Sequence, residues 1–242
     1  MARAHSTRSG AVVAQPLRWG RRAVFAFLIL TLHGCGGPPA GTPVPAIDAE
    51  RAAARALATS HVTAPLRVDF EWWLNERSLR VAGKGVARLE PDRARLDMFL
   101  HNGASVITIA LVDDEIRIPP GQMFDVLPAP PLLWAALGVF RPDDSMTLLG
   151  GEALGDDVIR LRYQLDDGSE LRYRIEGGRV QQVEIREDGH MVHRVALTLE
   201  DGCDHPTEAT YRQISAFREL RVQIDSVKTV DTYPAKIWDP RR

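Results

Sequence analysis

The sequence predicts a mainly β protein in which one curved antiparallel sheet forms an open half-barrel. Three observations lead to this fold class. Apolar and polar residues alternate with a period of two over most of the chain after Pro65, glycine-containing turns separate these segments, and no crossover helices lie between them. About ten hairpin-linked strands make a large sheet, which curls to cover its apolar face. We also expect a short N-terminal helix and one apolar helix that acts as a lid or plug.

The alternating segments predict strands that bury one face only. Turns such as 166–168 and 188–189 combine aspartate with glycine, which is typical of tight hairpins, so consecutive strands are expected to be antiparallel. This pattern excludes a doubly wound α/β fold. The apolar residues of the predicted strands are Val68, Phe70, Trp72 and Leu74; Leu79, Val81, Ala87 and Leu89; Ile159, Leu161, Tyr163 and Leu165; Leu171, Tyr173 and Ile175; Val183 and Ile185; residues 195–199; and Leu220, Val222 and Ile224.

Length and composition allow one folded domain with a sizeable core. The chain has 242 residues, of which 45% are apolar, and its formal net charge is -2. The balance of charges gives no basic field of the kind that drives binding to phosphates, which argues against a nucleic-acid partner.

Residues 1–34 are predicted to be a signal peptide. The apolar run 23–32 has ten residues, and a helix needs about 20 to cross a hydrocarbon core. Arg21-Arg22 loosely resembles a twin-arginine signal, so both Sec and twin-arginine export stay open. No acidic residue precedes the apolar run, whereas five arginines do: Arg3, Arg8, Arg18, Arg21 and Arg22.

The residues after the apolar run, Leu32-His33-Gly34-Cys35, resemble the lipobox of bacterial lipoproteins. This resemblance implies that Cys35 carries acyl chains such as palmitate, becomes the mature N-terminus and anchors the chain to a membrane of the cell envelope. The alternative is an ordinary secretory signal with a chance cysteine. If Cys35 is acylated, Cys203 has no partner for an intrachain disulfide and is expected to be an inert thiol.

The mature chain is predicted to begin with a flexible tether. Residues 35–46 are rich in proline and glycine, which hold neither a helix nor a sheet ladder. A short helix is expected from Ile47 to Thr59, because acidic residues occupy its first turn and alanines fill its middle. Residues 47–242 are then expected to form the single half-barrel domain.

An apolar segment interrupts the strand pattern. From about Pro131 to Phe140 we expect a helix, since Pro131 suits a first helical turn and Pro142 ends it. This helix has no polar face and must be buried, and a concave sheet offers the place to bury it.

Surplus apolar and aromatic side chains could line a ligand cavity between this helix and the sheet. Such a wall would bind an acyl chain through buried area. The alternative is a closed core in which the helix is packed permanently. The predicted cavity residues are Phe70, Trp72, Met98, Leu132, Leu133, Trp134, Leu137, Phe140, Tyr163 and Tyr173.

No sequence motif predicts catalysis, a metal site or a cofactor. The chain has no Gly-x-Ser-x-Gly elbow, no His-Glu-x-x-His and no Walker loop. His190 and His193 are interpreted as a surface pair on opposite faces of a strand. The segment Cys203-Asp204-His205 lacks third and fourth ligands at a recognisable spacing. We therefore expect no enzyme activity.

The order of these features resembles the bacterial LolA/LolB-like lipoprotein group, over roughly residues 66 to 230. Locally, 83–89 followed by 91–96 resembles a strand-turn-strand near the start of that fold, 132–138 resembles its Leu-Leu-x-x-Leu-Gly helix, and 206–222 its closing strands. The resemblance implies an open half-barrel with a cavity for the acyl chains of lipids or lipoproteins and no chemistry performed. It also implies that Gly36, rather than aspartate after the acylated cysteine, directs the chain to an outer membrane facing the periplasm.

Two functions from different classes follow. The first is a membrane-anchored lipoprotein that carries or accepts acyl chains in its cavity. The second is a lipid-anchored scaffold with a filled core that docks an envelope protein partner. An open apolar cavity would support the first, and a filled interior with an exposed patch would support the second.

Overall fold

The computed structural model describes residues 45–121 and 127–241. The predicted signal peptide, the acylated Cys35 and tether residues 35–44 lie outside them and stay predictions. Residues Pro43–Arg242 form one compact unit. No helix among the described residues has the length and apolar character needed to cross a membrane.

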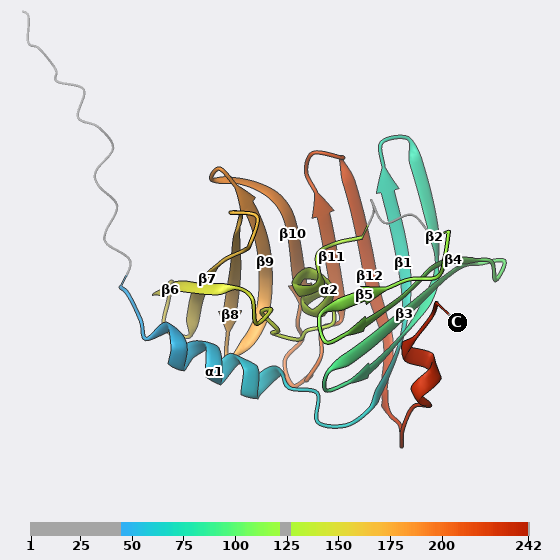
Figure 1. Cartoon of the computed structure of the whole chain (residues 1–242), viewed down its shortest axis with the longest axis horizontal. Helices are drawn as coiled ribbons and strands as arrows, with labels where there is room; N and C mark the ends of the chain where they lie inside the picture. Colours follow the sequence, from blue (N-terminus) through green and yellow to red (C-terminus); the bar gives the residue numbers. More distant parts are fainter. Residues whose placement is uncertain (1–44, 122–126, 242) are drawn as a thin grey trace, which may run out of the picture. The chain divides into compact units, whose positions relative to one another are not determined.

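The described residues form twelve strands, two α-helices and one 3-10 helix (Figure 1). Their bounds are α1 Ala49–Ser60, β1 Leu66–Glu76, β2 Leu79–Glu90, β3 Arg93–Leu100, β4 Ser105–Val112, β5 Glu115–Arg117, α2 Pro130–Ala136, β6 Thr147–Ala153, β7 Val158–Gln164, β8 Glu170–Glu176, β9 Arg179–Glu187, β10 His190–Thr198, β11 Glu208–Gln213, β12 Arg218–Thr229 and η1 Ala235–Trp238.

All twelve strands belong to one curved antiparallel sheet with the order β5-β4-β3-β2-β1-β12-β11-β10-β9-β8-β7-β6. The predicted open half-barrel is confirmed. The sheet is unclosed, with β5 and β6 as its two edges. Its central pairing joins the first strand to the last, β1 to β12, across the full length of both strands.

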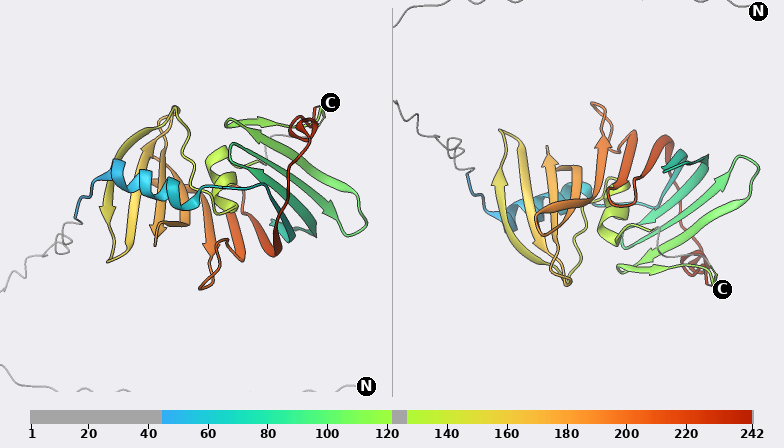
Figure 2. Two further views of the ribbon diagram at one scale, coloured as in Figure 1. Left: turned by 90° about the horizontal axis from the view of Figure 1, so that it is seen from below. Right: turned by 90° about the horizontal axis from the view of Figure 1, so that it is seen from above.

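This strand order explains why a helix lies across the concave face. Strands β5 and β6 are consecutive in the chain but lie at opposite edges of the sheet. The connection between them must therefore cross from one edge to the other, and it carries α2 (Figure 2). Because α2 packs against β9, β10 and β11, it meets the concave face near the middle of the sheet.

Helix α2 is shorter than the sequence predicts. It spans Pro130–Ala136 rather than Pro131 to Phe140, and Leu137 is its C-cap. Gly138 follows with a φ of +82°, a conformation that only glycine adopts without strain. Five of the seven helical residues are buried, as expected for a helix without a polar face.

Helix α1 forms close to its predicted position. It spans Ala49–Ser60, where the prediction was Ile47 to Thr59. The Asp48 carboxylate caps it by accepting a hydrogen bond from the Arg51 backbone N–H at 3.0 Å.

The end of the predicted tether is not a free linker. Ala46 forms a β-bridge with Glu152, and the Ala153 N–H donates to the Pro45 carbonyl at 2.9 Å. The prediction that residues 35–46 form no ladder is therefore wrong for Pro45 and Ala46. These residues instead cover part of the exposed edge of β6, which would otherwise offer unpaired backbone groups.

Helix α2 separates two hydrophobic clusters on the concave face. One cluster lies against β7 to β11 and includes Leu132 and Ala135 of α2. The other lies against β1 to β4 and includes Leu133 and Trp134. Both clusters therefore pack against α2, and burial on both sides explains why the helix has no polar face.

Candidate functional site

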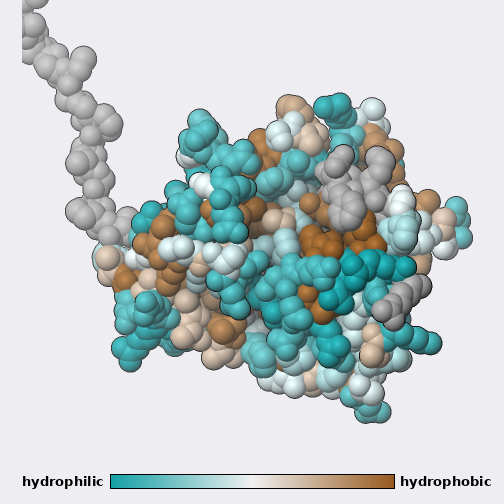
Figure 3. Space-filling model, viewed as in Figure 1, coloured by the Kyte–Doolittle hydropathy of each residue, from teal (hydrophilic) through white to brown (hydrophobic). Residues whose placement is uncertain are grey.

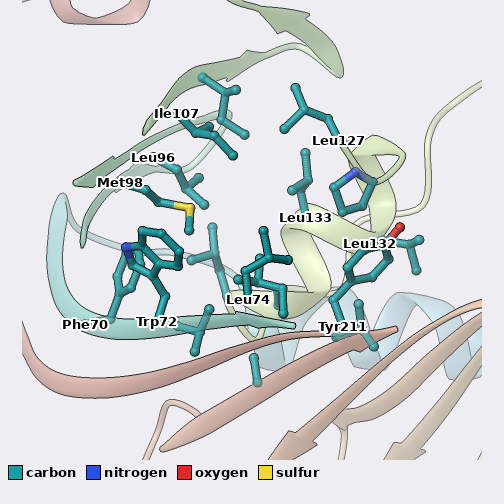
Figure 4. Close-up of a pocket in the computed structure, with 18 of the residues that line it drawn as sticks. Phe70, Trp72, Leu74, Leu96, Met98, Ile107, Leu127, Leu132, Leu133 and Tyr211 are labelled. Carbon is teal, nitrogen blue, oxygen red and sulfur yellow. The ribbon is translucent and has the colours of Figure 1, made fainter. Parts of the chain in front are cut away.

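A cavity of about 100 Å³ lies between α2 and the strands of the concave face (Figure 4). Its walls come from β1, β3 and β4 on one side, from β10, β11 and β12 on another, and from α2 together with Leu127 and Pro128. Its lining is almost entirely apolar, with Arg218 as its one charged residue. In the space-filling view, apolar side chains gather near the middle of the face over α2, with polar residues around them (Figure 3).

Two glycines opposite two aromatic residues shape the floor of this cavity. In the β1–β2 pairing, Phe70 lies opposite Gly85 and Trp72 opposite Gly83. A Cβ at Gly85 would lie 2.2 Å from Cζ of Phe70, and a Cβ at Gly83 would lie 1.9 Å from the backbone oxygen of Phe99. The aromatic rings therefore lie where side chains of β2 would otherwise stand. The sequence pattern alone did not indicate that Gly83 and Gly85 leave room for the rings of Trp72 and Phe70.

The structure brings six of the ten predicted cavity residues to this cavity. Phe70 and Trp72 of β1 lie beside Met98 of β3, on the wall opposite α2 (Figure 4). The remaining three are Leu132, Leu133 and Leu137, which belong to α2 and its C-cap. Whether any of them binds a ligand stays a prediction.

The other four predicted residues do not line the cavity, so the expected single wall does not exist. Trp134 is fully buried within the cluster against β1 to β4. Phe140, Tyr163 and Tyr173 lie in the other cluster, beyond α2. The rings of Phe140 and Tyr173 meet edge to face with centroids 4.7 Å apart, and Tyr163 meets Tyr173 at 5.9 Å. These three residues form a packed aromatic group, because α2 divides the concave face that the sequence pattern treats as continuous.

The C-terminal end of α2 is fastened to three other parts of the fold. Ser60, the last residue of α1, accepts a hydrogen bond from the Phe140 N–H at 3.0 Å. The Arg141 guanidinium lies 5.0 Å from the centre of the Trp134 ring and donates to Asp114 at 3.0 Å and to the Pro91 carbonyl at 3.1 Å. The N-terminal end has no side-chain cap. The helix is thus held more firmly at its C-terminal end.

Burial suppresses ionisation of the tyrosines near α2. Burial raises the pKa of Tyr163 to about 12, and raises the pKa of Tyr173 well above its ordinary value. The Tyr173 hydroxyl donates to the Arg141 carbonyl at 3.3 Å, which ties the aromatic group to the end of the helix segment. Both phenols are neutral at physiological pH.

Polar groups reach the cavity only through Tyr211 and Arg218. Two nitrogens of Arg218 donate to the two carboxylate oxygens of Glu76, each at 2.9 Å, and a third donates to Gln213 at 2.8 Å. This bidentate pairing lowers the pKa of Glu76. Since Arg218 already has a carboxylate partner, the cavity offers no unpaired charge to a ligand.

His193 is placed differently from the surface pair that the sequence suggests. Its ring is half-buried and lies 3.0 Å from the Tyr211 hydroxyl through Nδ1. A β-bulge between Met191 and His193 interrupts the expected alternation in β10. Burial lowers the pKa of His193, so the ring is neutral at neutral pH. His190 is exposed.

The described residues contain no group of three or more potential metal ligands among His, Cys, Asp and Glu. Cys203 is half-buried and has a free thiol. Its backbone carbonyl accepts a hydrogen bond from Arg179. His205 contacts the carbonyl of Pro206 through Nδ1 at 3.2 Å, rather than turning toward a shared ligand position.

The solved structures that are similar to this chain include the following three. A LolA superfamily protein from Nitrosomonas europaea has a TM-score of 0.57 and 11% identity, and the match covers 80% of this chain and 98% of that one. An outer-membrane lipoprotein-sorting protein domain from Vibrio parahaemolyticus has a TM-score of 0.55 and 10% identity, covering 78% and 94%. A DUF1329 family protein from Desulfovibrio piger has a TM-score of 0.51 and 9% identity, covering 79% and 97%.

No protein-family model matches the sequence, and no curated protein matches it. The structural likeness, which covers nearly all of each neighbour, establishes the fold. The chain has the LolA/LolB-like open half-barrel fold, with a helix across its concave face. This confirms the fold that the resemblance drawn from the sequence implies.

Proposed function

We propose that this protein is a membrane-anchored envelope lipoprotein that binds an acyl chain of a lipid or lipoprotein between α2 and the sheet, as a carrier or acceptor and without catalysis. The observation that carries this proposal is the chemistry of the cavity. Its lining is apolar, its one charged residue is already paired with Glu76, and it lies beneath a helix without a polar face. Such a site favours hydrocarbon and offers nothing to a polar substrate.

Buried area supplies enough free energy for transient binding. An acyl chain that buries about 300 Å² would gain several kcal/mol at about 25 cal/mol per Å². The cavity of about 100 Å³ is smaller than the roughly 300 Å³ of a small ligand pocket. A full chain therefore requires α2 to move. The uncapped N-terminal end of α2 is the end that we expect to yield, because Arg141 and Ser60 hold the other end.

The membrane anchor is a separate part of the proposal. The lipobox-like residues before Cys35 support acylation there, and Gly36 supports an outer-membrane location facing the periplasm. Two structural neighbours are named for the LolA superfamily and for outer-membrane lipoprotein sorting, which is compatible with an envelope role.

The size of the cavity favours a second candidate function. Much of the interior is filled by the protein's own side chains, since α2 is buried on both sides and the aromatic group of Phe140, Tyr163 and Tyr173 is closely packed. A lipid-anchored scaffold that docks an envelope protein would need no larger cavity.

Native mass spectrometry of residues 43–242, exported to the periplasm of a Gram-negative host, separates the two functions. Acyl carriage predicts a co-purified lipid that lipid extraction identifies. Leu137→Asp introduces a charge into the cavity lining, and Leu137→Trp fills the cavity without a charge; both should remove the ligand. Leu149→Asp, at an exposed position outside the cavity, is the matched control. A wild-type domain that is purified without lipid and takes up neither added palmitate nor added phospholipid would favour the scaffold function.

Metabolic labelling with palmitate tests the anchor. The full chain should incorporate label and partition with membranes, whereas Cys35→Ser should not incorporate label. Label that persists in Cys35→Ser would show that a residue other than Cys35 is acylated. That outcome would overturn the proposed anchor and leave the fold and the cavity unaffected.

A further inference from the structure

Arginines gather on the convex face of the sheet, on the side opposite α2. The buried side chains of β7, β8, β10 and β11 belong to the hydrophobic cluster on the concave face. Successive side chains of a strand point to opposite faces of the sheet, so the residues between the buried ones lie on the convex face. We call six of these residues the arginine face, and they are Arg160, Arg162, Arg172, Arg174, Arg194 and Arg212.

Strand pairing places these arginines directly opposite one another. Like charges that lie directly opposite on adjacent strands destabilise a sheet. The resulting repulsion does not help the chain to fold, and an anionic partner would relieve it. The cross-strand pairs are Arg160 with Arg174 and Arg162 with Arg172, between β7 and β8, and Arg194 with Arg212, between β10 and β11.

Glutamates on the same face neutralise only part of this charge. Glu152 accepts a hydrogen bond from Arg160 at 3.1 Å. Glu170 accepts two from Arg172, at 2.9 and 3.0 Å. The hydrogen bonds from Arg172, together with the charges of Arg172 and Arg162, lower the pKa of Glu170, although burial opposes this shift. The lowered pKa indicates that positive charge dominates the surroundings of this carboxylate.

Several guanidinium groups on this face are incompletely paired. Within residues 45–121 and 127–241, Arg174 and Arg194 have no acidic partner; Arg174 is exposed and Arg194 is half-buried. Four buried side-chain nitrogen or oxygen atoms of the described residues lack a hydrogen-bond partner. Three of these four are Nε atoms on the convex face, from Arg162, Arg186 and Arg194. Since buried donors in proteins are nearly always paired, this concentration marks the face as one whose partner is not the chain itself.

The arginine pairs form two basic blocks, one on β7 and β8 and the other on β10 and β11. Strand β9 separates them, and its Glu184 lies opposite Arg172 on one side and Arg194 on the other. Adjacent strands are about 4.8 Å apart, so the centres of the blocks lie about 14 Å apart. An extended peptide advances about 3.4 Å per residue. Carboxylates four residues apart would therefore reach both blocks from the same side of such a peptide.

Charge complementarity and shape favour an acidic polypeptide as the occupant. Guanidinium groups pair with carboxylates through two parallel hydrogen bonds. Glu184, between the blocks, would repel a uniformly charged polyanion, whereas a peptide with separated carboxylates avoids it. The sheet curves across its strands (Figure 2). A flat bilayer would therefore meet only part of the convex face, while an extended peptide can follow it.

We propose that the arginine face binds an acidic segment of a partner protein, which crosses β7 to β11 and places carboxylates four residues apart in the two basic blocks. The site lies on the opposite side of the sheet from the cavity. Binding there needs no acyl chain and does not depend on acyl carriage. It would supply the docking surface that a lipid-anchored scaffold requires, and it would equally hold a carrier beside its partner.

Fluorescence anisotropy of a labelled peptide tests this proposal on residues 43–242, the compact unit that contains both hydrophobic clusters. The probe is a serine-rich peptide with two pairs of glutamates that begin four positions apart. It should bind at low salt and weaken as salt screens the charges. A peptide of the same composition with four consecutive glutamates should bind about threefold more weakly, and one with glutamines in their place should not bind.

The double variant Arg174→Gln/Arg194→Gln should weaken binding about tenfold, because an exposed ion pair contributes up to about fivefold in affinity. Arg77→Gln/Arg80→Gln makes the same change of charge at exposed positions in the β1–β2 turn and at the start of β2, and should bind like the wild type. Thermal unfolding distinguishes binding from a structural role. The midpoint of Arg174→Gln/Arg194→Gln should equal or exceed that of the wild type, because like-charge repulsion is removed.

Failure of the wild-type domain to bind the spaced peptide at low salt would overturn the proposal, and so would equal losses of affinity in the two double variants. A large fall in the midpoint of Arg174→Gln/Arg194→Gln would show instead that these arginines serve the fold. Binding to dextran sulfate or to phosphatidylglycerol vesicles, without binding to the peptide, would assign the face to a polysaccharide or a membrane. A domain that binds the peptide but carries no lipid would refute acyl carriage and leave this inference standing.

Discussion

The Arg141 guanidinium lies 5.0 Å from the centre of the Trp134 ring, across the turn that ends α2. The same group donates to Asp114 at 3.0 Å and lies 3.4 Å from Asp92. One side chain therefore connects the buried helix to the β2–β3 and β4–β5 turns. This connection explains how a seven-residue helix, too short to be stable alone, keeps one position on the concave face.

Arg141→Ala should destabilise the domain by about 2 kcal/mol, since it removes the cation–π contact and the partly exposed ion pairs together. Arg141→Lys should destabilise the domain less than Arg141→Ala does, because the positive charge remains but an ammonium group cannot reproduce the planar hydrogen-bonding geometry of guanidinium. Urea unfolding followed by circular dichroism measures the change. Arg174→Ala, at an exposed position of β8, is the control. An unchanged midpoint for Arg141→Ala would mean that packing alone holds α2.

Asp97 predicts a pH-dependent contribution to stability. Its carboxylate is buried on β3 and receives hydrogen bonds from Arg95, Arg88 and Thr108. Burial raises the pKa of Asp97, but the hydrogen bonds and the charges of Arg95 and Arg88 outweigh it, so its pKa is lowered. A lowered pKa stabilises the fold above the unfolded value of about 3.9, and this contribution disappears as the pH falls through the folded pKa.

Asp97→Asn should therefore cost about 3 kcal/mol near neutral pH, because two arginines lose their shared carboxylate. The difference from wild type should shrink as the pH falls below about 4. Chemical unfolding at a series of pH values tests this, with Asp166→Asn in the exposed β7–β8 turn as the control. A difference that stays constant down to the lowest pH would refute the assignment.

Gly83 and Gly85, which lie opposite Trp72 and Phe70, should respond differently to replacement by alanine. At Gly83 the new Cβ would meet the backbone of Phe99, which cannot move away without disturbing β3. Gly83→Ala should destabilise the domain by about 3 kcal/mol. At Gly85 it would meet the Phe70 ring, a side chain that lines the cavity, and would lie 3.0 Å from the backbone oxygen of Asp97. Gly85→Ala should cost about 1 kcal/mol and reduce acyl uptake.

Thermal unfolding and native mass spectrometry measure the two effects separately. Gly155→Ala is the control, because a Cβ there would have its nearest contact at 3.9 Å, from Val158. Equal destabilisation by Gly83→Ala and Gly85→Ala, with unchanged acyl uptake by Gly85→Ala, would contradict a role of Phe70 in the cavity.

Phe217 predicts that a substitution in an exposed turn leaves stability intact or raises it. Its side chain is 78% exposed and its φ is +51°. Phe217→Gly relieves the positive φ without removing a buried contact, so we expect stability equal to wild type or higher by up to about 1 kcal/mol. Thermal unfolding measures the change, and a large loss of stability would show that Phe217 packs against the fold.

Local sequence information was sufficient for the strands and for the character of the helix. Strands such as β1 and β7 follow from strict alternation, because one face is buried and the other wet. Strand β4 was not predicted, since its second half is a continuous buried run without alternation. The burial of α2 followed from its composition, whereas its end at Ala136 depended on the positive φ of Gly138.

The candidate site depended on contacts that no local pattern contains. Phe70 and Trp72 of β1 reach the same cavity as Met98 of β3, because Gly83 and Gly85 leave β2 without side chains between them. Tyr163 and Tyr173 share the same alternating pattern but lie beyond α2, in the other cluster. Period and composition give the face of a strand on which a side chain lies, but not which neighbour covers that face.

The sequence by itself determined that the chain forms one-sided antiparallel strands, that one helix must be buried, and that the ends of the hairpins turn where aspartate and glycine permit. Tertiary structure alone decided that β1 pairs with β12, and that the β5–β6 connection crosses the concave face. The physical reason is range. Alternation and turn chemistry act within a few residues. The β1–β12 pairing, in contrast, joins residues more than a hundred positions apart, and the place of α2 depends on contacts with strands that are distant from it in the chain.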